Sequence, residues 1–481
     1  MAIEKIMGSE TELGITSRSA SAFDPVGSSI FLINALPEAH GRAMWDYTGE
    51  NPLLDARGYE VTGERERPSA QDNRSINRVL TNGGRWYVDG AHPEYSTPET
   101  TNARDLVLFE KAGERIADRC REVANRTLPP HQQLVLYKNN SDGKGNSYGY
   151  HENYLMARSV PFEMLVEVLT PFLVSRIVYA GAGKVGSENG AESCAYQVSQ
   201  RADFFETLIG LDTMAKRPII NTRDEPHADE ERYRRLHVIV GDSNMSEVST
   251  YLKVGTTALV LAMVEDGALR RDLALEDPVR AIKEISHDTT CTRKVRLKRG
   301  KEFSAIELQR EYLDLARAYY ATVEQSPQVT DLLERWERVL AQLAEDPHQC
   351  ARELDWVIKH ELIRSYMSRK EVGFDDQRIS MLDLQYHDIR RDRGLYYRLC
   401  RADQVNRLFD DETVEQATAV PPQTTRAKVR ADFINFANER NKSYDVGWSY
   451  LKLNDRYQRT ILCKDPFKPT DPRVDELISS G

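Results

Sequence analysis

Apolar residues recur at helical spacing in four stretches of the second half of the chain. Residues 245–264 form a long apolar run that ends before Gly267, a residue type that commonly follows a helix. Ser304 and Glu307 have the spacing of a capping box ahead of a further apolar stripe. Two more stripes run through residues 332–343 and 354–366. The pattern therefore predicts four helices between residue 245 and residue 366.

Short β-type runs dominate the first 150 residues, and one further run follows at residues 237–242. Alternation predicts a strand within residues 4–15, and further strands are expected at residues 85–88, 134–137 and 237–242, each closed by turn residues. Strands and helices are mixed without regular βαβ alternation. We therefore expect an α+β fold, with an antiparallel sheet and helices to one side.

The C-terminal part differs from the rest of the chain. A Pro421-Pro422 pair precedes an alternating stretch at residues 448–453. With 481 residues, the chain is long enough for several domains of about 100–200 residues each. We expect a large domain over residues 1–408 and a small one over residues 409–481.

Composition narrows the functional classes. The formal net charge is −10, which disfavours wrapping of nucleic acid, because that needs a dominant basic face. The six cysteines have neither CxxC nor zinc-finger spacing. The N-terminal residues do not form a signal peptide, and residues 160–180 are too often interrupted to span a membrane. We expect a cytosolic protein with no membrane segment.

Two carboxylates fall on one face of the first predicted strand. Glu10 and Glu12 are at positions i and i+2, so their side chains project about 7 Å apart from the same surface. Such a pair suits a hard divalent cation, which takes oxygen ligands. A solvated strand face is the alternative interpretation.

The strand at residues 85–88 offers a second cluster. Arg85, Tyr87 and Asp89 alternate onto one face, and Glu94 follows after a sharp turn. A cation, a phenol and two carboxylates would suit a metal–phosphate site with a catalytic carboxylate. A mixed polar edge strand would have the same composition.

Two further segments are rich in polar residues, and the first of them also contains several glycines. Residues 138–153 contain three glycines, followed by His151, Glu152 and Asn153, but neither a Walker A loop nor a Rossmann fingerprint. This segment is either a ligand-binding loop or an ordinary surface loop. Residues 221–237 contain Arg223 and the run Arg232–Arg235, which suit an anion clamp or a solvated helix face. His237 opens an apolar strand, where it is either functional or a hydrogen-bonded core histidine.

Together these clusters resemble the depupylase and Pup-ligase family, relatives of glutamine synthetase and the carboxylate–amine ligases. The similar stretches include MGSETELGI, RWYVDGAHPEYSTPE, LYKNNSDGKGNSYGYHENYLMAR, IINTRDEPHADEERYRRLHVIVGDSNMSE and LKLNDRYQRTILCKDPF, and they extend from residue 7 to residue 467. The resemblance implies a glutamine synthetase-like fold. In it a curved antiparallel sheet forms an open cradle backed by helices, and a small C-terminal domain packs against it.

The resemblance also implies cofactors and roles for individual residues. The cofactors would be ATP, or ADP with phosphate, and Mg²⁺. Asp89 would be the catalytic carboxylate, and Arg223 would stabilise developing negative charge. The residues implied for nucleotide binding are Arg85, Thr97 and Trp448, and those implied for metal binding are Glu10, Glu12, Tyr87, Glu94, His151 and His237. His227 lies in a matching motif.

Within this family the sequence favours the depupylase. An insertion at about residues 38–80, carrying Trp45-Asp46-Tyr47 and residues 51–58, resembles a loop that the ligases lack. The spacing in Asp89-Gly90-Ala91-His92 is also typical of the depupylase. The stretches AGAGKVG, GDSNMSE, PPQTTRA and RTILCKDPF look more like the ligase. A Pup–protein ligase and an inactive Pup-binding protein are therefore the alternatives.

The implied partners are the small modifier Pup and pupylated proteins in the bacterial cytoplasm. Because Pup is acidic, an acidic enzyme must gather positive charge where Pup docks. The run Arg232–Arg235 and the arginines at 390, 391 and 393 are candidate docking patches.

Overall fold

A six-stranded sheet forms the centre of the computed structural model, which describes residues 2–18, 23–36, 43–62, 67–214 and 216–480. The strand order is β15-β10-β1-β8-β7-β6, and every neighbouring pair is antiparallel. The strands are β1 (Met7–Glu12), β6 (Asn77–Val79), β7 (Arg85–Asp89), β8 (His92–Ser96), β10 (Tyr150–Ala157) and β15 (Tyr233–Val238). The antiparallel sheet expected from the sequence is confirmed.

One expected strand is displaced. The segment predicted at residues 237–242 begins earlier, so β15 contains most of the arginine run that had suggested a helix face. The helix interpretation was wrong because apolar Leu236 and Val238 alternate with polar residues at the period of a strand.

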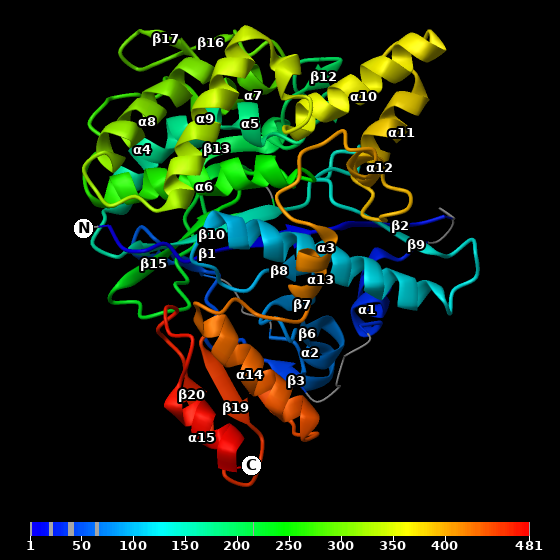
Figure 1. Ribbon diagram of the computed structural model, residues 1–481, viewed down its shortest axis with the longest axis vertical. Coiled ribbons are helices and arrows are strands. Elements are labelled where there is room, and N and C mark those ends of the chain that lie inside the picture. The colour runs from blue at the N-terminus through cyan, green and yellow to red at the C-terminus, as the bar shows by residue number, and fades with distance from the viewer. Residues whose placement is uncertain (1, 19–22, 37–42, 63–66, 215, 481) are drawn as a thin grey trace.

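Helices cover one side of the central sheet (Figure 1). They are α3 (Ala103–Asn125), α4 (Phe162–Ser175), α5 (Ile177–Ala180), α6 (Glu247–Glu265), α7 (Pro278–Ser286), α8 (Ala305–Tyr320), α9 (Pro327–Glu345), α10 (Asp355–Lys370), α11 (Gln377–Tyr386) and α12 (Leu395–Arg401). The four predicted helices correspond to α6, α8, α9 and α10. The capping box of α8 is formed, since Ser304 and Glu307 each accept a hydrogen bond from the other's backbone N–H.

Burial inside the fold accounts for the apolar composition of helix α6. Among the described residues, it alone is long and apolar enough to cross a membrane, but 89% of its apolar window is buried inside the fold. Its side chains share a hydrophobic core with Met7 and Tyr154 of the sheet and with α8 and α9. Helix α6 therefore serves as the central core helix behind the sheet.

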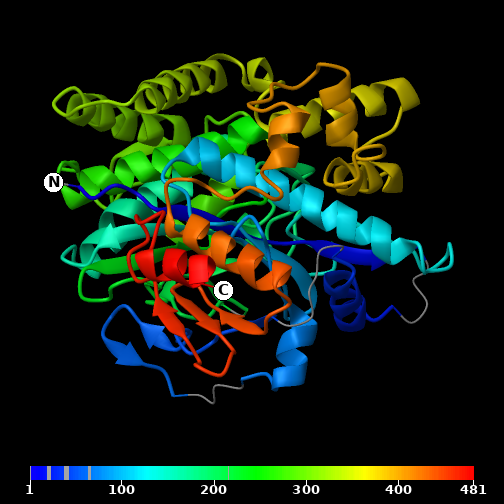
Figure 2. The same ribbon diagram turned by 60° about the horizontal axis from the view of Figure 1, so that its bottom comes forward.

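The C-terminal segment builds a second, smaller sheet in the order β20-β19-β18-β3. Its elements are β3 (Ala43–Trp45), β18 (Tyr444–Val446), β19 (Tyr450–Leu453) and β20 (Thr460–Leu462), with α14 (Arg426–Glu439) and α15 (Pro472–Ser480) beside it. Strand β3 comes from the insertion and pairs in parallel with β18. Figure 2 shows these orange and red elements next to the blue strands of the insertion. A division at residue 408 stays a prediction, and the small sheet takes one strand from the N-terminal part.

The remaining elements are short. Strand pairs are β2 (Gly14–Ser17) with β9 (Leu134–Tyr137), β4 (Leu54–Asp55) with β5 (Tyr59–Glu60), β11 (Lys184–Val185) with β12 (Tyr196–Gln197), β13 (Phe205–Gly210) with β14 (Arg217–Asn221), and β16 (Lys294–Arg296) with β17 (Glu302–Ser304). The other helices are α1 (Pro25–Asn34), α2 (Ala70–Ile76), α13 (Asp411–Gln416) and two 3₁₀ turns, Ala202–Phe204 and Pro347–Cys350. Residues 38–42 and 63–66 of the insertion lie outside the described residues.

Candidate active site

One face of the central sheet gathers the polar residues that the sequence singled out. Glu10 pairs with His151 on one side and Ser96 on the other, and Glu12 pairs with Glu94. Side chains of paired residues project to the same face of a sheet. The face opposite the helices therefore carries Glu10, Glu12, Arg85, Tyr87, Asp89, His92, Glu94, His151, Asn153, Arg235 and His237.

Glu152 was grouped with its neighbours in the sequence, but it does not belong to this site. It projects to the other face, where both carboxylate oxygens bind the guanidinium of Arg176, at 2.6 and 2.8 Å. Both side chains are fully buried. The strand alternation that brings His151 and Asn153 to the site sends Glu152 into the core.

Glu10 stands at the centre of the first cluster. Its Oε2 lies 3.1 Å from Nδ1 of His151, and its Oε1 accepts a hydrogen bond from Asn153 at 3.1 Å. Burial acts to raise the pKa of Glu10, but the hydrogen bond with His151 and the positive charge of Arg235 hold it well below its usual range. Glu10 is therefore ionised.

His237 completes that cluster as a neutral imidazole. Burial, followed by the charge of Arg235, holds the pKa of His237 well below its usual range. Its Nδ1 lies 3.0 Å from Oδ1 of Asn153, whereas Nε2 is buried and has no hydrogen-bond partner among the described residues. Ligand atoms of Glu10, His151 and His237 lie within 4.8 Å of one another. A carboxylate with two imidazoles suits a divalent metal ion.

The second cluster consists of three carboxylates. Oxygen atoms of Glu12, Asp89 and Glu94 lie within 4.8 Å of one another. Burial and the charges of Asp89 and Glu12 raise the pKa of Glu94 well above its usual range. Its Oε2 is buried and has no hydrogen-bond partner in the described part of the chain. An orphaned oxygen among mutually repelling carboxylates fits Mg²⁺, which prefers oxygen ligands and would offset the repulsion.

Tyr87 lies beside this cluster. Its hydroxyl is within 3.4 Å of Oγ of Ser96. Burial and the charge of Glu94 raise the pKa of Tyr87 well above its usual range, so the phenol is neutral. A metal role for Tyr87 stays a prediction.

Asp89 stands at the exposed end of β7, facing a groove. Desolvation by the groove walls, followed by the charge of Glu12, raises its pKa. The positive charges of His151 and Arg223 act in the opposite direction. The segments that carry His151 and Arg223 therefore lie close enough to influence the pKa of Asp89, the predicted catalytic carboxylate.

A pocket opens on one side of Glu10. Thr97, Trp448 and His227 line it, and the nucleotide-binding roles that the resemblance implies for the first two stay a prediction. Oγ1 of Thr97 accepts a hydrogen bond from the backbone N–H of Ser9 at 3.0 Å, which fixes its position on β1. The indole of Trp448 meets that of Trp45 edge to face, with centroids 5.1 Å apart.

Arg85 lies outside the lining of this pocket. Its guanidinium is stacked between Trp45 and Tyr87, at 4.1 and 3.9 Å from their ring centroids. It donates to Oδ1 of Asn77 at 2.6 Å and lies 3.6 Å from Glu50. Its predicted role in nucleotide binding is not tested by this geometry.

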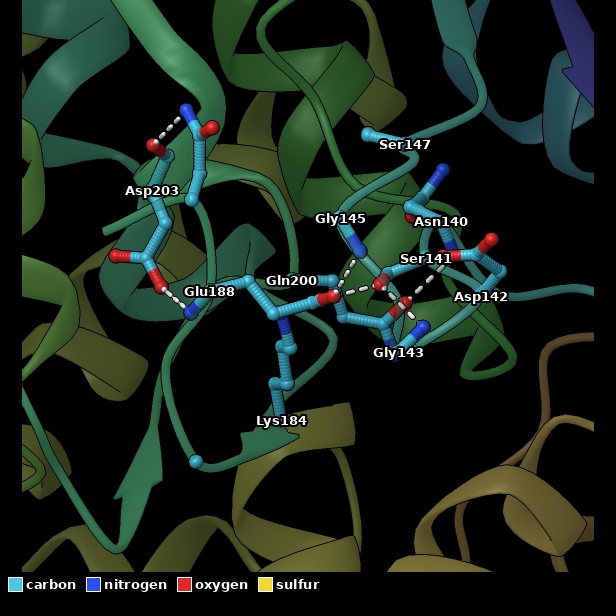
Figure 3. A network of polar contacts seen from close by, with 12 residues as sticks. Asn140, Ser141, Asp142, Gly143, Gly145, Ser147, Lys184, Glu188, Gln200 and Asp203 are labelled. Atoms are coloured by element: carbon cyan, nitrogen blue, oxygen red, sulfur yellow. Dashed lines mark hydrogen bonds and ion pairs between the residues drawn. The ribbon is translucent and has the colours of Figure 1, made fainter. Parts of the chain in front are cut away.

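A second, larger groove opens beside Asp89. Asp89, Glu12 and His151 form one wall, and the loop at residues 139–149 forms another. Glu188 holds this loop (Figure 3): its carboxylate accepts hydrogen bonds from the hydroxyl of Ser141 and from Gly145 N at 3.0 Å, and it pairs with Lys184. These contacts hold the glycine-rich loop in place as one wall of the groove.

The insertion reaches the site through Asp55. Its carboxylate accepts a hydrogen bond from Oγ1 of Thr222 at 2.6 Å, and Ala56 N donates to Thr222 O at 2.7 Å. Arg223 follows directly and lies 3.7 Å from Glu225. The insertion therefore fastens the segment that carries Arg223.

Arg235 was assigned to a surface docking patch, and this placement was wrong. It lies 3.7 Å from Glu10 and 3.1 Å from Glu225, and it donates to Oδ1 of Asn153. Its side chain is only 11% exposed. The period-2 pattern of residues 233–237 would have placed Arg235 on the same face as His237. Glu225 and the groove residues Arg201 and Arg217 were not singled out by sequence.

Comparison with known proteins agrees with this architecture. The family described as Pup-ligase protein matches residues 5–452. A depupylase from Acidothermus cellulolyticus is 49% identical over 489 residues, covering 99% of this chain and 97% of that protein. A Pup–protein ligase from Kineococcus radiotolerans is 50% identical and covers 85% of this chain and 91% of its own.

Solved structures give the same result. The crystal structure of a complex between Pup and its ligase PafA has a TM-score of 0.86 and 35% identity, covering 99% of this chain and 92% of that one. A structure of PafA in complex with ADP has a TM-score of 0.79 and 37% identity, with coverage of 88% and 95%. The chain therefore belongs to the Pup-ligase protein family.

Proposed function

We propose that this protein is a depupylase. It hydrolyses the isopeptide bond between the C-terminal glutamate of Pup and a substrate lysine, and it deamidates a C-terminal glutamine of Pup. It binds ATP, or ADP with phosphate, together with Mg²⁺, and acts on Pup and pupylated proteins in the bacterial cytoplasm. The ADP-bound and Pup-bound relatives support the nucleotide and the partner.

The docked insertion is the observation that carries the choice of depupylase. It resembles a loop that the ligases lack, and it contacts the site at two points. Asp55 fastens the backbone before Arg223, and Trp45 stacks on Arg85. The depupylase relative spans 99% of this chain and the ligase relative from Kineococcus spans 85%, but the structure of the ligase PafA with Pup also covers 99%, so the choice rests on the contacts of the insertion and not on coverage.

The cofactors would occupy the two features described above. Glu10, Glu12 and Glu94 would hold Mg²⁺, with His151 and His237 as further candidate ligands, and Thr97 and Trp448 would contact the nucleotide. Bound Mg²⁺ supplies charge neutralisation of the phosphates and polarisation of the scissile carbonyl.

Asp89 performs the central chemical step. As a carboxylate, it either removes a proton from water that adds to the carbonyl carbon, or it adds to that carbon itself. The carbon–nitrogen bond then breaks, and the leaving amine takes the proton that Asp89 removed from water or, if Asp89 itself added to the carbon, a proton from solvent. In the second case water then hydrolyses the acyl bond to Asp89, which releases the C-terminal glutamate and restores the carboxylate. Arg223 lies where it can stabilise the negative charge that develops on the carbonyl oxygen.

A Pup–protein ligase is the second candidate, favoured by the Kineococcus relative and by the PafA structures. One experiment separates the possibilities. The protein is incubated with ATP and Mg²⁺ and with pupylated protein, with Pup ending in glutamine, or with Pup ending in glutamate plus a lysine substrate. Release of the unmodified protein from its pupylated form, or of ammonia from Pup ending in glutamine, supports the depupylase. Conjugation alone identifies a ligase, and no product in any assay indicates an inactive binder.

Pup docking would use a basic hollow at the edge of the molecule. Arg390 and Arg393 line it together with Arg18, Arg121 and Arg126. Several of these arginines have an acidic neighbour, such as Asp388 for Arg390, so the hollow is only moderately positive. It is the remaining candidate patch, because Arg235 lies inside the site.

A further inference from the structure

Two arginines lie in the wall of the large groove, on the side away from the nucleotide pocket. Arg201 is 2% exposed and donates to the backbone carbonyls of Ile239 and Gly241, the latter at 3.2 Å. Arg217 donates from Nη2 to the carbonyl of Ser147 at 2.7 Å. Neither guanidinium forms an ion pair with a carboxylate in the part of the chain that the structure describes.

The two arginines differ in whether all of their buried N–H groups have hydrogen-bond acceptors. Arg201 is surrounded by carbonyl oxygens and supports the groove wall. Arg217 keeps a buried Nε atom that has no hydrogen-bond partner among the described residues. A buried cationic donor without a partner is unfavourable unless a ligand satisfies it. A guanidinium of this kind is best satisfied by a carboxylate, which it can bind with two parallel hydrogen bonds.

The position of Arg217 relates this free donor to the reacting groups. It lines the same groove as Asp89, Glu12 and His151. Glu12, which also lines this groove, lies near enough to both Arg217 and Asp89 for its charge to act on each of them. Lys144 lines the groove as well. The groove thus has an acidic wall at Asp89 and a basic wall at Arg217.

We propose that Arg217 binds the main-chain carboxylate of the substrate's last residue and so turns that residue's side-chain carbonyl toward Asp89. This inference rests on the proposed function, in which the substrate is a chain ending in glutamate or glutamine. In such a residue the terminal carboxylate is only a few bonds from the reacting carbonyl. An internal glutamate or glutamine lacks the carboxylate, so Arg217 selects the end of the chain.

The test compares two forms of one ligand. Pup ending in glutamine is prepared with a free terminal carboxylate and with a terminal carboxamide, each carrying a fluorophore at its N-terminus. Binding is measured by anisotropy in the presence of ATP and Mg²⁺. We expect the carboxamide to bind the wild-type protein at least about tenfold more weakly, the scale of a lost charge-assisted bond.

Variants locate this selectivity. Arg217→Gln should weaken binding of the free acid by about tenfold and of the carboxamide by less than about twofold, so that the two affinities converge. Arg217→Lys keeps a charge and one donor for Ser147, and it should retain part of the preference. Lys216→Gln removes an exposed charge one residue away and should leave the preference unchanged.

Three results would overturn the proposal. They are a wild-type protein that does not distinguish the two peptides, an Arg217→Gln variant that keeps the wild-type ratio, and equal weakening of both peptides, which would indicate that Arg217 only supports Ser147. Arg217→Lys provides the same comparison if Arg217→Gln does not fold. Because binding needs no turnover, a chain that proved to be a ligase would still show the selectivity, and the two proposals fail separately.

Discussion

Nδ1 of His151 lies 3.1 Å from Oε2 of Glu10, which joins the neighbouring strands β10 and β1 on the polar face of the sheet. The second oxygen of Glu10 is held by Asn153. These two contacts therefore fix the orientation of the Glu10 carboxylate before a metal ion binds. Preorganised ligands bind metal with a smaller loss of conformational freedom.

Glu10→Gln should weaken divalent metal binding. The amide removes the negative charge that the surrounding cations hold in place, while keeping the size of the side chain. Mn²⁺, monitored by electron paramagnetic resonance, serves as a probe, and we expect its affinity to fall at least about tenfold, as for loss of one charged ligand. Glu4→Gln, in the exposed segment before β1, should bind Mn²⁺ like the wild type. Unchanged affinity in Glu10→Gln would remove Glu10 from the metal site.

Asp89→Asn should abolish turnover while nucleotide binding survives. Asparagine can neither accept a proton nor act as a carboxylate nucleophile, so kcat should fall by at least about a hundredfold. The pocket that we propose for the nucleotide does not include Asp89, so the Kd for a fluorescent ATP analogue should stay within about twofold of the wild-type value. Substantial product formation by this variant would show that another group carries the chemistry.

The polar face of the sheet could be predicted in part because its signals are local. The alternation of Arg85, Tyr87 and Asp89 fixes one face of β7, and Glu10 and Glu12 do the same for β1. Cross-strand register is not local: Glu10 meets His151 about 140 residues later in the chain. The family resemblance, rather than the pattern, supplied that connection.

Other features depend on contacts that no local pattern contains. The parallel pairing of β3 with β18 joins residues 43–45 to residues 444–446. The hydrogen bond between Asp55 and Thr222 likewise joins residues that are 167 positions apart in the sequence. Arg235 was misplaced because a run of arginines suggests a solvated surface, whereas burial between Glu10 and Glu225 makes its charge part of the site.

Glu188→Gln should loosen the wall of the large groove. The amide loses the ion pair with Lys184 and one of the two acceptors used by Ser141 and Gly145. Hydrogen exchange of the amides at residues 143–147 should speed up by about tenfold or more, reflecting easier local opening. Glu192→Gln, at an exposed position of the neighbouring segment, is the matched control. Equal exchange in the two variants would mean that Glu188 does not hold the loop.

Binding of Pup should weaken as the salt concentration rises. An acidic ligand approaching a basic hollow is attracted over a distance comparable with the Debye length, about 8 Å at physiological ionic strength. Replacing both Arg390 and Arg393 by Gln should reduce this salt dependence, with Arg299→Gln on an exposed turn as the control. Salt-independent binding would exclude the hollow as an electrostatic docking surface.

Glu99 should couple the C-terminal helix α14 to the central part of the fold in a pH-dependent way. Its carboxylate pairs with Arg426 at 2.8 Å and also with Arg430. Burial acts to raise the pKa of Glu99, but the charges of Arg430 and Arg426 lower it from 4.5 to about 2. Because the pKa is lower in the folded protein, the stabilisation is fully present above pH 4.5 and is lost as the pH falls toward 2.

Glu99→Gln should therefore destabilise the protein at neutral pH by about 3 kcal/mol, since it also leaves two buried guanidinium groups without their carboxylate. The measurement is the difference in unfolding free energy between variant and wild type, followed from neutral pH to pH 3. That difference should shrink as the pH falls below 4.5, because the wild-type carboxylate then begins to take up its proton. Glu439→Gln, exposed at the end of α14, should show no such trend. A difference that stays constant with pH would mean that the destabilisation comes from lost packing rather than from the charge of Glu99.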